Sequence, residues 1–142
     1  MAHKQKKFPK SKQAMEHLLA SDEKFELLIK KIGPPKLFYS HERGVFEALA
    51  SSIIYQQLHG KAAATIQARF VALLSPTGEF PSPQKVLQST HEQLLTCGLS
   101  RAKAAAILDL ADKIHSGAVP EREQTESMSN EELIAAFTQV RG

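Results

Sequence analysis

Residues 51–63 read Ser51-Ser52-Ile53-Ile54-Tyr55-Gln56-Gln57-Leu58-His59-Gly60-Lys61-Ala62-Ala63 and contain the most unusual turn of the chain. Two adjacent glutamines follow an apolar segment, and His-Gly-Lys opens an alanine-rich run. We expect one helix to end near the glutamines and the next to begin at Gly60. Such a helix N-terminus, with a glycine and a lysine, can attract phosphate. The residues alone also fit an ordinary interhelical turn with a surface histidine, and they favour that simpler interpretation.

Apolar residues recur at helical spacing along most of the chain, and no segment alternates as a strand does. N-cap patterns occur at Ser82 before Pro83, at Thr90 and at Ser129. The sequence therefore predicts an all-α, multi-helix bundle with short loops. Its predicted helices cover residues 11–19, 22–32, 42–55, 60–74, 100–115 and 130–137. The predicted buried stripe of the second helix is Phe25, Leu28, Ile29 and Ile32.

The charge of the chain is uneven. Residues 1–12 carry five lysines and no acid, whereas the other residues carry 13 Lys and Arg against 15 Asp and Glu. Such a basic arm either adds non-specific attraction to phosphate or is a disordered, solubilising end, and the second interpretation is favoured. We therefore divide the chain into a basic tail, residues 1–12, and one incomplete all-α domain, residues 13–142.

Several classes of protein are not indicated. No apolar run approaches the roughly 20 residues that span a bilayer, and no apolar segment typical of a secretion signal follows Met1. No phosphate-cradling glycine loop is present. Cys97 has no second cysteine to pair with, and we expect it to be a small apolar residue at a helix end. Together these features favour a reduced, intracellular setting.

Asp109, Asp112 and His115 fall at i, i+3 and i+6 of the predicted helix over 100–115. That spacing is compatible with a metal site, but the face opposite the apolar stripe must be polar in any case. A solvated face is favoured, and we predict no metal.

Two further segments resemble binding turns. Gly98-Leu99-Ser100-Arg101-Ala102-Lys103 is a short loop in which Ser100 caps a long helix, so that Arg101 and Lys103 project at its start. An ordinary helix start with two basic side chains explains the same residues. The last residues, Phe137-Thr138-Gln139-Val140-Arg141-Gly142, read as the front half of a helix–hairpin–helix, a unit that binds the DNA backbone. Spacing alone does not bring these segments together.

In combination, the segments resemble the helix–hairpin–helix/GPD superfamily of DNA glycosylases, and most of all its 3-methyladenine DNA glycosylase II branch. The likeness covers about residues 15–142 in consistent order. It is strongest in Tyr55-Gln56-Gln57-Leu58-His59-Gly60-Lys61-Ala62-Ala63, in Gly98-Leu99-Ser100-x-x-Lys103-Ala104, and in Phe137-x-x-Val140-Arg141-Gly142. The resemblance implies that the chain forms the N-terminal portion of the glycosylase fold and stops within the hairpin.

The resemblance also implies roles for single residues. His59 matches a side chain that probes the minor groove beside the lesion, and Tyr55 lies close to the aromatic pocket for the base. Arg101 sits near the position of the wedge that fills the gap left by a flipped base, although an apolar residue is common there. The implied DNA-binding residues are His59, Gly60, Lys61, Ser100, Arg101, Lys103, Val140, Arg141 and Gly142.

The implied reaction is excision of alkylated purines, such as 3-methyladenine, from duplex DNA after base flipping. An aspartate supports the charge that develops at the sugar, and in the family it lies beyond the position of Gly142. We therefore assign no catalytic residue and expect little or no excision by this chain alone, because Asp109 and Asp112 belong to a different helix.

The resemblance implies no cofactor, and a monovalent cation at the hairpin only if that motif is completed. We expect a monomer that acts on double-stranded DNA with alkylated bases, without a membrane, in the cytoplasm and nucleoid or in a nucleus. Two alternatives stay open: a DNA-binding module without catalysis, and an inactive gene fragment.

Overall fold

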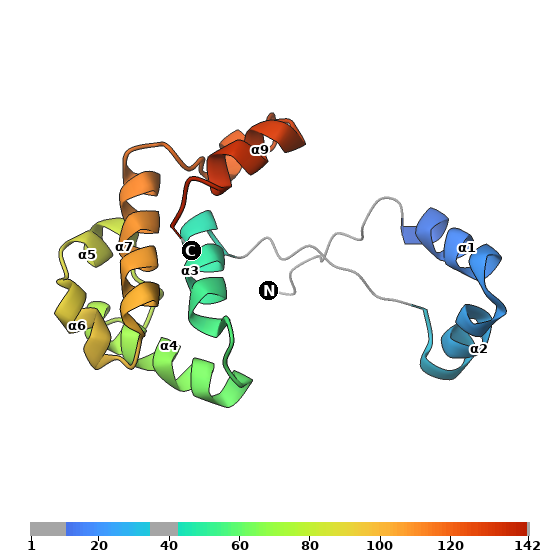
Figure 1. Ribbon diagram of the computed structural model, residues 1–142, viewed down its shortest axis with the longest axis horizontal. Helices are drawn as coiled ribbons and strands as arrows, with labels where there is room; N and C mark the ends of the chain where they lie inside the picture. The colour runs from blue at the N-terminus through green and yellow to red at the C-terminus, as the bar shows by residue number, and fades with distance from the viewer. Residues whose placement is uncertain (1–10, 35–42, 142) are drawn as a thin grey trace. The chain divides into compact units, whose positions relative to one another are not determined.

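The computed structural model describes residues 11–34 and 43–141, which belong to two compact units, unit 1 (residues 1–42) and unit 2 (residues 43–142). The described residues form helices and no strand, which confirms the predicted all-α class (Figure 1). Most of the predicted basic tail and Gly142 lie outside the described residues, and the division of the chain after residue 12 stays a prediction.

Unit 1 contains α1 (Ser11–Ser21) and α2 (Glu23–Ile32), close to the predicted bounds. Asp22 accepts a hydrogen bond from the Lys24 amide at 2.8 Å and so caps α2. The predicted stripe of α2 is covered only in part within this unit: Phe25 and Ile29 are half-buried, whereas Leu28 and Ile32 are exposed.

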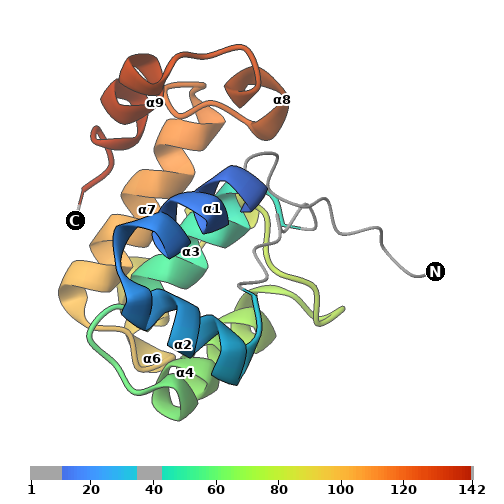
Figure 2. The same cartoon turned by 90° about the vertical axis from the view of Figure 1, so that its right-hand side faces the viewer.

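Unit 2 contains α3 (Val45–Tyr55), α4 (Gly60–Leu74), α5 (Pro83–Leu87), α6 (His91–Thr96), α7 (Arg101–His115), α8 (Arg122–Thr125) and α9 (Asn130–Phe137). Helix α7 packs against α3, α5 and α6, and α3 also packs against α4. Figures 1 and 2 both show α7 running beside α3. The largest fully buried side chains are those of Phe70, Ile54, Leu94, Ile107, Leu110, Val86 and Val119.

Because α7 has neighbours on several sides, much of its surface is buried. Its buried residues are Ala104, Ala106, Ile107, Leu110, Ala111 and Ile114. This packing therefore fixes the position of α7 relative to α3, α5 and α6 within unit 2. Among the described helices, none has both the length and the apolar character needed to cross a membrane.

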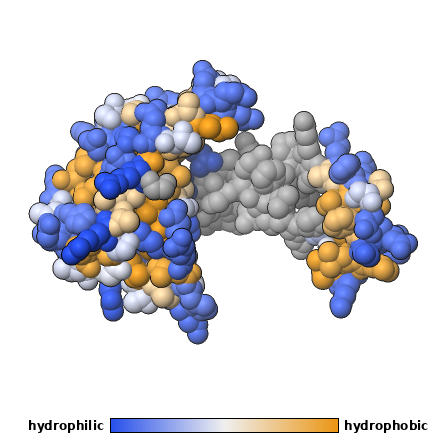
Figure 3. Space-filling model, in the orientation of Figure 1, coloured by the Kyte–Doolittle hydropathy of each residue, from blue (hydrophilic) through white to orange (hydrophobic). Residues whose placement is uncertain are grey.

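The predicted caps are present. Ser82 accepts from the Lys85 amide, and Thr90 with Gln93 and Ser129 with Glu132 form reciprocal capping boxes. Such caps satisfy amides that a helix leaves without partners at its start. On the face of unit 2 seen in Figure 3, apolar residues show between hydrophilic ones.

Candidate nucleic-acid interface

The turn between α3 and α4, residues 55–60, is called here the glutamine turn. Gln56 leaves the helix with extended backbone, and Gln57 has a φ of 54°, in the left-handed region that non-glycine residues rarely occupy. The side chains of Tyr55 and Leu58 are 42% and 39% exposed. This turn therefore presents two large apolar side chains to solvent.

His59 is the N-cap of α4, and its Nδ1 accepts a weak hydrogen bond from the Lys61 amide at 3.4 Å. In the neutral tautomer that accepts at Nδ1, the proton is on Nε2, on the opposite side of the ring. Gly60 begins the helix, and a Cβ added there would meet no atom within 4 Å. Lys61 is exposed. The start of α4 is thus open, polar and positively charged.

The second turn, residues 98–103, is called here the serine turn. Gly98 has a φ of +94°, and a Cβ there would lie 3.3 Å from Cγ1 of Ile66 on α4. Ser100 caps α7 by accepting from the Lys103 amide at 3.2 Å. Leu99 is buried, whereas Arg101 is exposed. The turn therefore rests on α4 and exposes an arginine at the first position of α7.

Lys103 joins the two turns. Its Nζ donates hydrogen bonds to the carbonyl oxygens of Ile54 at 2.7 Å and Gln56 at 2.8 Å. The side chain is half-buried, and burial lowers the pKa of its ammonium group below the ordinary value. We expected Lys103 to project toward DNA beside Arg101. Its ammonium group instead binds the main chain at the end of α3, because that helix end offers carbonyls without partners.

The entry to the predicted hairpin is held by Asp109. Its carboxylate pairs with Lys113 Nζ at 2.6 Å and accepts from the Arg141 amide at 2.7 Å. The Lys113 hydrogen bond is the main reason why the pKa of Asp109 lies below its ordinary value; burial opposes this effect, and the Arg141 amide adds to it. Asp109 is therefore more than part of a solvated face, which corrects our expectation for this residue.

The remaining hairpin residues differ in exposure. Val140 is half-buried against the core, and Arg141 is exposed. The predicted contact of Gly142, and with it the cation site that needs a completed hairpin, lies outside the described residues. In the part of the chain that the structure describes, no group of three His, Cys, Asp or Glu residues is arranged to hold a metal ion.

Tyr55 lines a shallow cavity of about 450 Å³ along one face of α4, together with Ala64, Gln67, Ala68, Val71, Ala72 and Gly78. Its lining contains no carboxylate. Oε1 of Gln67 is buried without a hydrogen-bond partner. The cavity therefore has an aromatic wall and one unused acceptor, but no acid of its own.

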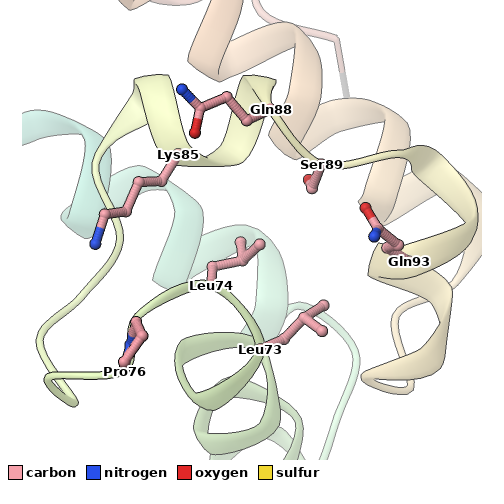
Figure 4. Close-up of a pocket in the computed structure, with 7 residues that line it drawn as sticks. All are labelled: Leu73, Leu74, Pro76, Lys85, Gln88, Ser89 and Gln93. Carbon is pink, nitrogen blue, oxygen red and sulfur yellow. The ribbon is translucent and has the colours of Figure 1, made fainter.

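A second cavity, of about 310 Å³, lies at the other end of α4 (Figure 4). Its floor is apolar, and its rim carries polar groups from α5 and α6. The lining residues are Leu73, Leu74, Pro76, Lys85, Gln88, Ser89 and Gln93. Because a helix rises about 1.5 Å per residue, Leu74 is roughly 20 Å from Gly60 along α4. This cavity therefore lies far from the start of α4 in the glutamine turn.

Cys97 is the C-cap of α6 and is buried. Burial raises the pKa of its thiol, while a hydrogen bond with Thr96 and the charge of Arg69 act in the opposite direction. A buried thiol with a raised pKa is a poor nucleophile. This agrees with the predicted role as a small apolar residue.

Residues 50–141, well over half of the chain, match the family described as HhH-GPD superfamily base excision DNA repair protein. The chain belongs to this superfamily. It is 36% identical over 127 residues to DNA-3-methyladenine glycosylase 1 of Schizosaccharomyces pombe, which covers 89% of this chain and 55% of the relative. It is 31% identical over 131 residues to the alkylbase DNA glycosidase-like protein mag2 of the same organism, covering 92% and 62%.

A solved structure, that of the S. pombe 3-methyladenine DNA glycosylase Mag1 in complex with abasic DNA, is similar with a TM-score of 0.79. The two chains are 35% identical, and the likeness covers 91% of this HhH-GPD chain and 63% of that one. The chain thus spans less than two thirds of the length of the relatives it matches. The family and the fold implied by the sequence are confirmed.

The structure brings the glutamine and serine turns together through Lys103, which sequence spacing did not predict. It also shows structural contacts that the sequence reasoning missed. His91 Nε2 lies 3.1 Å from the carbonyl oxygen of Arg101, and Asp109 binds the main chain near the hairpin. The sequence could not indicate either contact. In both, the partner is a main-chain group, and every residue carries such groups.

Proposed function

We propose that this chain binds duplex DNA with alkylated bases and forms the DNA-contacting part of a 3-methyladenine-type DNA glycosylase. The observation that carries the proposal is the junction at Lys103, since it holds the glutamine and serine turns at one edge of unit 2. Membership of a base-excision repair superfamily supports a DNA-binding role for this edge. The similarity to a glycosylase solved with abasic DNA supports the same choice of partner.

The exposed groups of this edge suit a DNA backbone. Lys61 and Arg101 are exposed cations on the two turns, and the first amides of α4 follow the open Gly60. Arg141, next to the contact with Asp109 on α7, is a third exposed cation. Helix N-termini and basic side chains are common phosphate contacts, which position a protein without reading sequence. His59 adds a ring whose Nε2–H lies away from its own helix. We propose that this histidine contacts the minor groove beside the lesion.

Leu58 is a better candidate than Arg101 for the wedge at the flipped base. Proteins that kink or open a duplex often insert an apolar side chain between base steps. Of the two leucines in the turns, Leu58 is 39% exposed, whereas Leu99 is 5% exposed and packs in the core. Arg101 is then free to serve as a phosphate contact at the start of α7.

We further propose that the chain binds DNA without excising a base. Excision of this type needs a carboxylate beside the reacting sugar, and the cavity at Tyr55 is lined by none. Asp109 already pairs with Lys113 and the Arg141 amide. In this proposal the chain is an intracellular monomer that uses no cofactor, and Tyr55 supplies an aromatic wall near the flipped base.

The test combines two assays on the 142-residue chain. Fluorescence anisotropy with an abasic duplex and with an undamaged duplex measures binding at several salt concentrations. A gel-based excision assay on methylated duplex DNA measures catalysis. Salt-dependent binding that is tighter for the abasic duplex, without excision, is the expected result. Absence of binding to both duplexes contradicts DNA binding, and turnover contradicts the non-catalytic role.

A further inference from the structure

Helix α3 ends in a way that needs an external partner. The last carbonyls of a helix have no intrahelical donor, and they carry the negative end of the helix dipole. A helix often stops at a glycine in the left-handed region, but here Gln57 occupies that region with a φ of 54°. A non-glycine residue with this backbone conformation is strained and persists only where surrounding contacts hold it.

Lys103 supplies that partner from a distant part of the sequence. Its two hydrogen bonds, of 2.7 and 2.8 Å, reach the carbonyls of Ile54 and Gln56, on either side of Tyr55. Its own amide is held by Ser100 Oγ at 3.2 Å. Lys103 is thus fixed at its backbone by the serine turn and at its ammonium group by the glutamine turn.

The serine turn is itself held from two other sides. A Cβ at Gly98 would touch Ile66 of α4, and His91 Nε2 contacts the carbonyl oxygen of Arg101. Arg101 and His59 therefore lie on two turns that share one rigid junction. An ammonium group that binds two carbonyls is also a poor candidate for a phosphate contact, since its charge is directed into the protein.

We propose that Lys103 is a positioning residue that locks the glutamine turn to the serine turn and so sets the spacing of the DNA-contacting side chains. Its contribution to DNA affinity comes through this geometry and not through a phosphate contact. The inference rests on the proposed DNA binding.

The salt dependence of binding separates the two roles. Each phosphate neutralised by a protein cation contributes about −0.9 to the slope of log affinity against log salt concentration. Loss of a phosphate-contacting lysine therefore makes the slope shallower by about 0.9, whereas loss of a positioning lysine lowers affinity at an unchanged slope. Lys61, an exposed lysine at the start of α4, is the matched control.

The experiment compares Lys103→Met, Lys103→Arg and Lys61→Met in the full chain, with an abasic duplex as the probe. We expect Lys103→Met to bind about tenfold more weakly at the wild-type slope and Lys61→Met to have the shallower slope. Lys103→Arg keeps a cation with several donors and should restore most of the affinity. A shallower slope in Lys103→Met, with no loss at low salt beyond that of Lys61→Met, overturns the proposal.

Amide hydrogen exchange tests the junction without DNA. The amides of Gln56 and Leu58 donate to Ser52 and Tyr55 at the end of α3. In Lys103→Met they should exchange at least tenfold faster, while the core amide of Leu110 stays protected and Lys61→Met leaves both turn amides unchanged. If these amides exchange at the wild-type rate in Lys103→Met, the proposal that Lys103 holds the end of α3 is wrong.

These two readouts also separate the proposals. If the wild-type chain does not bind DNA, the proposed function fails, whereas the exchange rates still decide whether Lys103 holds α3. If Lys103→Met unfolds, Lys103→Arg is the deciding variant. Turn amides that are protected as in wild type, together with wild-type affinity, support the positioning role of Lys103. Tenfold faster exchange of these amides at unchanged affinity contradicts it.

Discussion

Asp109 Oδ2 accepts a hydrogen bond of 2.7 Å from the backbone amide of Arg141. The same carboxylate pairs with Lys113 one turn further along α7. A single side chain in the middle of the central helix thus fixes the segment that follows α9 and leads into the predicted hairpin. Figure 1 shows this segment descending from α9 beside α7.

Replacing Asp109 by alanine should lower the free energy of unfolding by about 1 kcal/mol, since it removes a charged hydrogen-bond acceptor and an i,i+4 ion pair. Urea melts measure this change. The matched control is Asp112→Ala on the same helix, because Asp112 is exposed and should change stability by less than about 0.5 kcal/mol. Equal losses of unfolding free energy in the two variants would contradict the structural role of Asp109.

The pH dependence of stability follows from the lowered pKa of Asp109. A carboxyl group with a folded pKa below its unfolded value stabilises the fold above the unfolded value, about 3.9, and this contribution is lost as pH falls through the folded pKa. The difference in unfolding free energy between wild type and Asp109→Asn should be constant above about pH 5 and shrink as the pH falls through the lowered folded pKa of Asp109. If this difference in unfolding free energy grows as the pH falls, the ionised Asp109 carboxylate does not stabilise the fold.

Gly98 and Gly60 should respond to alanine in opposite ways. At Gly98 the positive φ and the nearby Ile66 side chain predict a loss of about 1–3 kcal/mol. Gly60 lies at a helix start with open space around it, so alanine there should keep or slightly raise stability. If the DNA backbone approaches Gly60 closely, Gly60→Ala weakens binding without destabilising the protein. Thermal melts and anisotropy measure the two effects, and undiminished affinity in Gly60→Ala contradicts the close approach.

Leu58→Ala should weaken binding to the abasic duplex more than binding to the undamaged duplex. A wedge acts where a base is missing or flipped, and Leu58 is exposed enough that its truncation costs little stability. Arg101→Gln serves as the comparison, since loss of a phosphate contact weakens both duplexes alike. If Leu58→Ala affects the two duplexes equally, the wedge role is wrong.

Local features of the fold followed from the sequence. Ser82, Thr90 and Ser129 were expected as caps and are caps, because a cap depends on residues only three positions away. The bounds of α4 and α9 agree with the predicted residues. Helix α8, Arg122–Thr125, was not predicted, since four residues are too few to show a helical period.

The tertiary roles of charged residues did not follow from the sequence. Lys103 and Asp109 read as solvent-facing charges on an amphipathic helix, but both bind main-chain groups of remote segments. Main-chain carbonyls and amides occur at every residue, so the sequence does not show which of them a side chain binds. The packing of α7 against its neighbours determines these partners. The adjacency of the two turns depended on the same packing.

We propose that the glutamine and serine turns form one DNA-contacting surface, and an NMR titration would show this surface residue by residue. Backbone amide signals of the full chain are followed as an abasic duplex is added. We expect the largest shifts on residues 56–61, 99–103 and 139–141, and we expect the two turns to saturate at the same DNA concentration. Unchanged signals in these turns, with shifts confined to α5 and α6, would contradict it.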